Sequence, residues 1–160
     1  MYVTIKESNG FNTENLVALA KELNFRPVVS HRRRMGLNKF NALSQYSNTK
    51  YLTWTAGQRD IFKNNFNKEV MDKTLVNWFV KFDAEVGFLD KMTAWVDDKS
   101  PAWLTIFVID GKATVMLGEE TIELNKGDGL HFPLSYIHSV EKNEVGCTLA
   151  CAMTMDQVLK

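Results

Sequence analysis

The spacing of apolar and polar residues along the chain changes near residue 74. Before that point, Leu16, Leu19 and Ala20 recur at helical spacing, which predicts an amphipathic helix over residues 14–24. After it, apolar residues at 76, 78, 80 and 82 alternate with others, and a period of two predicts a strand. The chain therefore divides into a mostly helical first part and a mostly β second part.

The first part, residues 1–74, is predicted to be a helical and irregular extension packed on the second. Asn12 or Thr13 can cap the helix over 14–24, because a side-chain oxygen there can accept a hydrogen bond from a free backbone amide. Pro27 prevents the helix from continuing. A second short helix is predicted within residues 58–73 from Ile61, Phe62 and Phe66.

The second part, residues 75–160, reads as a series of short strands with turns between them. The run 103–109 is almost continuously apolar, which predicts a strand buried on both faces. Asp110-Gly111 then predicts a type I′ hairpin turn, in which both central residues need positive φ. Further turns at 118–120 and 125–128 separate predicted strands at 121–124, 129–132, 136–140 and 147–153. This spacing favours a mainly β sandwich or barrel, forming one compact domain with the extension.

Composition narrows the class of protein. The 160 residues carry 19 Lys and Arg against 19 Asp and Glu, so no overall charge draws the chain to nucleic acid. The sequence contains no run of about 20 apolar residues, so it predicts no membrane-spanning helix. Cys147 and Cys151 are four residues apart, too far along a strand for a disulfide with each other, and are predicted to be small buried residues. Free thiols, with no secretory signal at the N-terminus, predict a cytoplasmic location.

The segment GDGLHFPLSYIH, residues 127–138, holds the most specific motif. Gly127, Pro133 and His138 follow the spacing G, five residues, P, four residues, H. This register resembles the second conserved motif of the cupin superfamily, although Ser135 stands where the family has a second Gly and Lys142 where it has Asn. The resemblance implies a double-stranded β-helix, or jelly-roll barrel, that encloses a small-molecule ligand or a metal. It also implies a homodimer.

The first cupin motif, which supplies most metal ligands in that family, is degenerate in this chain. When its last Gly is aligned with Gly111, its Glu position falls on Leu104. Its two His positions fall on Asp97 and Lys99, or on Asp98 and Ser100. Of the family's ligands, only His138 is retained.

Three functions follow from the degenerate motif. In the first, the barrel is a small-ligand binding or structural module that has lost its metal. Alternatively, it is a cupin dioxygenase or isomerase with one divalent transition metal (Fe, Ni, Mn or Zn), held by His138 or His131 with Asp97 or Asp98, since imidazole and carboxylate suit such ions. In the third, the N-terminal helix and Arg32–Arg34 form a surface for a partner protein, because guanidinium groups bind oxyanions well.

Strand parity predicts which residues line the barrel. If Leu104 and His138 point inward, then Ile106 and Val108 do so from one strand and Tyr136 from the other. These residues, with His131, are the candidate ligand-binding set. For His131 the simpler alternative is a partly exposed structural histidine. Such a lining is mostly apolar, with Tyr136 and His138 as polar groups, and suits a small and partly apolar ligand.

Overall fold

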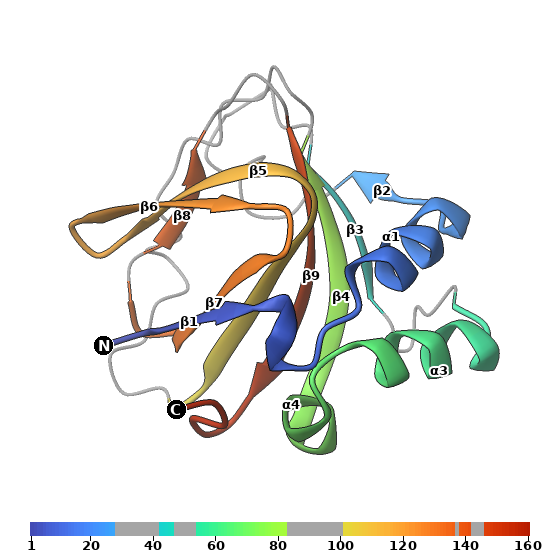
Figure 1. Cartoon of the computed structure of the whole chain (residues 1–160), viewed down its shortest axis with the longest axis horizontal. Helices are drawn as coiled ribbons and strands as arrows, with labels where there is room; N and C mark the ends of the chain where they lie inside the picture. Colours follow the sequence, from blue (N-terminus) through green and yellow to red (C-terminus); the bar gives the residue numbers. More distant parts are fainter. Residues whose placement is uncertain (28–41, 47–53, 83–100, 137, 142–145) are drawn as a thin grey trace.

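The computed structural model describes residues 1–27, 42–46, 54–82, 101–136, 138–141 and 146–160 (Figure 1). The helices are the short 3₁₀ helix η1 (Glu7–Asn9), α1 (Thr13–Glu22), α3 (Ala56–Asn65) and α4 (Lys68–Lys73). The strands are β1 (Val3–Lys6), β2 (Arg26–Pro27), β3 (Ala42–Tyr46), β4 (Thr74–Phe82), β5 (Trp103–Leu117), β6 (Glu120–Asn125), β7 (Asp128–Pro133), β8 (His138–Glu141) and β9 (Cys147–Thr154). The prediction of a mainly β fold is confirmed.

All strand pairings among the described residues are antiparallel, and β5 joins the two layers of the barrel. The main path runs β1-β7-β5-β9-β4-β3-β2. The first half of β5 pairs with β7 and β9, whereas its second half pairs with β6 and β8. Figure 1 shows β5 curving from the layer of β9 and β4 toward β6 and β8. One strand therefore supplies residues to both walls of the interior.

The predicted hairpin at Asp110-Gly111 is wrong, because β5 continues through this pair. The register against β9 shifts between Val108 and Asp110, which marks a β-bulge. Gly111 has φ 75°, but no residue other than glycine has positive φ in the described part, so a type I′ turn is not formed. A bulge inserts one residue and changes the parity of the strand. Interior positions are accordingly even-numbered before it and odd-numbered after it, namely Leu104, Ile106 and Val108, then Ala113, Val115 and Leu117.

The first 74 residues are not only helical and irregular, because β1, β2 and β3 extend the sheet. β1 pairs with β7, and β3 pairs with β4. The predicted helix over 14–24 is confirmed as α1, capped by the Asn12 side chain, which accepts from the Asn15 amide. The predicted second helix is two helices, α3 and α4, separated by Phe66 and Asn67.

The sheet buries both of its faces. The outer face of β4, β5 and β9 packs beneath α1, α3 and α4, and this helix-side cluster holds, among others, Phe11, Leu16, Phe62, Phe79, Phe107 and Ile109. The inner face forms the barrel cluster, whose buried members are Leu104, Ile106, Val108, Ala113, Val115, Leu117, Leu124, Leu130, Phe132, Cys147, Leu149 and Cys151. Among the described residues, no helix is both long and apolar enough to span a membrane.

Candidate functional site

The barrel cluster brings together four of the six residues of the candidate ligand-binding set, namely Leu104, Ile106, Val108 and Tyr136. Leu104, Ile106 and Val108 lie on one face of β5, and each is less than a tenth exposed. Register pairs Leu104 with Phe132 and Ile106 with Leu130, so β7 adds two large side chains to the same face. Tyr136 follows in the turn after β7 and packs against the cluster while remaining partly exposed. The ligand-binding role of these residues remains a prediction.

His138 and the two predicted carboxylate ligands are described only in part. The backbone of His138 begins β8 and pairs with Leu117, a member of the barrel cluster, but its side chain lies outside the described part of the chain. Asp97, Asp98 and Arg32–Arg34 lie outside the described residues. Among the residues that the structure does describe, no three His, Cys, Asp or Glu side chains form a group able to hold a metal ion.

His131 does not line the barrel interior, contrary to the prediction. It lies between Leu130 and Phe132 on a continuous strand, and because neighbouring residues on a strand face opposite sides, it points away from the barrel cluster. It is also 0% exposed, so the alternative of a partly exposed histidine is wrong as well. The turn that follows β7 does not change this parity, because the strand runs without interruption through His131 to Pro133.

Cys147 and Cys151 are two interior residues whose burial was predicted but whose place in the site was not. Both are free, buried and part of the barrel cluster. Burial, together with the charge of Asp110, raises the pKa of the Cys147 thiol to about 12. Burial also raises the pKa of Cys151, with Cys147 as the second cause. Both side chains are therefore neutral thiols at physiological pH, and thiolate, not thiol, is the form that ligates metals.

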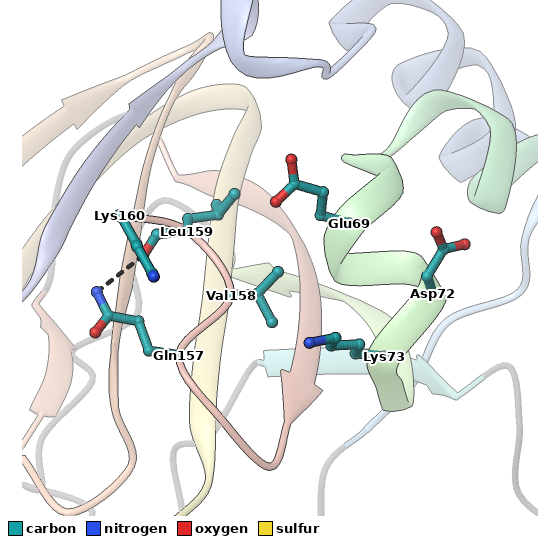
Figure 2. A pocket seen from close by; sticks show the side chains of 7 residues that line it. All are labelled: Glu69, Asp72, Lys73, Gln157, Val158, Leu159 and Lys160. Atoms are coloured by element: carbon teal, nitrogen blue, oxygen red, sulfur yellow. Dashed lines mark hydrogen bonds between the residues drawn. The ribbon is translucent and has the colours of Figure 1, made fainter.

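A pocket that the sequence does not predict lies between α4 and the C-terminal tail, residues 155–160. This open pocket of ≈ 630 Å³ is lined by Glu69, Asp72 and Lys73 from α4 and by Gln157, Val158, Leu159 and Lys160 from the tail. Figure 2 shows the Lys73 side chain reaching from the helix toward Val158. No sequence signal pointed to this pocket, because its two walls are about 85 residues apart in the chain and neither carries a motif.

No protein-family model and no curated protein matches the chain, but several solved structures match it. The non-haem α-ketoglutarate-dependent epimerase SnoN from nogalamycin biosynthesis matches with a TM-score of 0.65 and 11% identity, covering 97% of this chain and 77% of that one. KdgF from a Halomonas species matches with a TM-score of 0.50 and 14% identity over 86% of this chain and 92% of its own. A putative glyoxylate-induced protein from Pseudomonas aeruginosa matches with a TM-score of 0.52 and 9% identity, covering 88% of this chain and 41% of that one.

Identities this low establish the fold alone. The agreement covers nearly the whole chain in SnoN, so it includes the N-terminal strands and helices as well as the barrel. These neighbours are proteins of the cupin type. The chain therefore has a cupin-like double-stranded β-helix fold, as its second motif indicated.

Proposed function

We propose that the barrel binds a small, uncharged and predominantly apolar ligand, and that the chain acts as a binding module with a degenerate metal site. The observation that carries this proposal is the chemistry of the barrel cluster. Its buried members within the described residues are aliphatic or aromatic side chains and two neutral thiols. A charged ligand would lose its hydration there without an opposite charge to replace it, which costs several kcal/mol.

An apolar ligand gains from the same lining. Removing apolar surface from water contributes about 25 cal/mol per Å², so a small hydrophobic molecule can bind without ionic contacts. Tyr136, partly exposed at the edge of the cluster, supplies a hydroxyl that can both donate and accept a hydrogen bond. A neutral molecule with a hydroxyl or carbonyl group at one end is therefore the ligand class that we propose.

Two isoleucines on β5 give a matched test of this site. Ile106 is 5% exposed and belongs to the barrel cluster, whereas Ile109 is 0% exposed and belongs to the helix-side cluster. With N-phenyl-1-naphthylamine as an apolar fluorescent probe, we expect saturable binding that Ile106→Phe weakens by about tenfold or more, since the larger ring occupies ligand space. Ile109→Phe should leave the probe's affinity unchanged, although both variants add the same volume to a core.

Circular dichroism and urea unfolding of each variant show whether it is folded under the binding conditions. Equal weakening by both substitutions would mean that binding follows overall stability and not the barrel interior. Unchanged binding in folded Ile106→Phe would refute the proposed site.

The second candidate is a metal-dependent cupin dioxygenase or isomerase that uses His138 with Asp97 or Asp98. It is supported by the match to SnoN, which was also solved in complex with Fe³⁺ and α-ketoglutarate. If these residues hold a metal, it would supply the chemistry of a Lewis acid or a redox centre. His138 would then supply an imidazole ligand and the aspartate a carboxylate ligand.

Metal content distinguishes the two candidates. We expect protein purified without oxygen to contain well under one equivalent of iron, nickel, manganese or zinc by inductively coupled plasma mass spectrometry, because a single retained imidazole is too few ligands for stable binding. About one metal per chain that is lost in His138→Ala, but kept in His31→Ala, would establish the metalloenzyme instead.

A surface for a partner protein, built on α1 and Arg32–Arg34, is the third candidate. A homodimer and a cytoplasmic location are also part of our proposal. The cupin fold supports the first, and the unpaired thiols of Cys147 and Cys151 support the second.

A further inference from the structure

The C-terminal tail is held to the sheet by a hydrogen bond to a buried imidazole. The backbone amide of Val158 donates to Nε2 of His131, with the two nitrogens 3.1 Å apart. On the other side of the ring, Nδ1 lies 2.8 Å from Oγ1 of Thr105. The indole of Trp103 packs on the ring, with centroids 4.9 Å apart and planes inclined at 32°. The imidazole is thus enclosed by β5, β7 and the tail.

These contacts determine the protonation state of His131. A backbone amide can only donate, so Nε2 must present its lone pair to Val158. The single proton of the neutral ring is therefore on Nδ1, which donates to Thr105 Oγ1. Protonation of Nε2 would place two N–H groups against each other and abolish the bond to the tail. The bond between sheet and tail exists only while His131 is neutral.

The rest of the tail is anchored lightly. Two further hydrogen bonds of this segment are local, from Thr154 Oγ1 to the Asp156 carbonyl and from Gln157 Nε2 to the Leu159 carbonyl. Val158 and Leu159 pack at the margin of the helix-side cluster and remain partly buried. Among the described contacts, the His131 bond is therefore the polar link between this segment and β7.

We propose that residues 155–160 form an acid-released clasp, in which protonation of His131 detaches the tail from the sheet. Release removes one wall of the pocket between α4 and the tail and uncovers the apolar surface beneath Val158 and Leu159. The device does not depend on the proposed ligand of the barrel, since His131 faces the opposite side of the sheet.

The direction of the pH effect follows from burial. Burial lowers the pKa of His131 from 6.5 to about 4, and a backbone hydrogen bond with Leu104 opposes this shift only in part. In the released state the ring is exposed and its pKa returns to the ordinary value. Protons then bind the released state more tightly between these two values, so the clasp is fully stable above pH 6.5 and weakens as the pH falls toward 4.

Charged groups surround the clasp without setting this pKa, whose two causes are burial and a backbone bond. The tail contributes Asp156 and Lys160, and α4 contributes Glu69, Asp72 and Lys73 along the pocket. On the strands that flank His131, Lys6 and Asp128 pair with each other at 2.7 Å. Because these carboxylates lie near the clasp, a test must separate their effect from that of the histidine.

Amide hydrogen exchange of Val158 in the full chain tests the clasp. With pKa values of 6.5 and about 4, the released population should rise on the order of 60-fold between about pH 7 and pH 4.5, after correction for the intrinsic exchange rate. The amide of Ala150, in the core of β9, should keep its protection because release is local.

His131→Gln is the matched variant, because its side-chain oxygen can accept from Val158 but does not titrate. It should keep Val158 protected at both pH values. A pH-independent Val158 in the wild type would overturn the proposal, as would the same acid response in His131→Gln, which would assign the effect to the carboxylates. Parallel loss of protection at Ala150 would show global unfolding instead of a clasp, and would equally overturn it.

Discussion

Gly111→Ala is expected to lower the free energy of unfolding by about 3 kcal/mol or more. The positive φ of 75° at this position costs a residue with a side chain roughly 1–2 kcal/mol. A Cβ atom here would also clash with the carbonyl oxygen of Gly146. That oxygen accepts from the Lys112 amide at 3.1 Å, so relief of the clash would sacrifice a hydrogen bond worth about 1 kcal/mol. Chemical denaturation, at an unchanged m-value, measures the loss.

Gly118→Ala is the matched control for this prediction. Gly118 also has positive φ, 61°, but nothing lies within 4 Å of the position that a Cβ atom would take there. In this variant the free energy of unfolding should fall only by the cost of the left-handed backbone conformation, roughly 1–2 kcal/mol. Equal losses at the two glycines would show that the close approach of residues 111 and 146 does not matter for stability.

Phe107→Ala is expected to have the second large effect, lowering the free energy of unfolding by about 3–5 kcal/mol. Phe107 is 0% exposed on the outer face of β5, where its ring stacks on Phe11 with centroids 4.4 Å apart. Truncation therefore leaves a cavity between the sheet and the N-terminal segment, and that cavity collapses poorly between rigid rings. Thermal and urea unfolding both report the change.

Phe25→Ala provides the same substitution at a less buried place. Phe25 packs at the margin of the helix-side cluster and is partly buried, so we expect the free energy of unfolding to fall by about 1–2 kcal/mol. A larger loss at Phe25 than at Phe107 would mean that the helix-side cluster is centred elsewhere than the structure indicates.

Elements that depend on local patterns could be predicted from the sequence. Helix α1 has a capping residue and a clear apolar face, and β4 has an apolar residue at every second position from Val76 to Phe82, so both are predicted close to their observed bounds. The interior positions of β5 before the bulge also followed from parity. In each case the side chains of a few neighbouring residues contain the required signal.

Features that depend on distant partners could not be predicted. Asp110-Gly111 has the local chemistry of a hairpin, yet Gly111 serves a close approach to Gly146. β1 has only four residues and is defined by its pairing with β7. The contact between His131 and Val158 joins residues 27 apart, and the imidazole carries no sign in the sequence of which sheet face it occupies.

The parity change in β5 has a consequence for how this chain can vary in length. Loss of one residue at the bulge would turn Ala113, Val115 and Leu117 outward and their neighbours inward, exchanging the faces of the whole second half of the strand. The turn at Gly118 is free of such coupling, because nothing packs near the place of a side chain at that residue. Insertions and deletions among related sequences should therefore gather between β5 and β6, whereas the count of residues from Trp103 to Leu117 should hardly change.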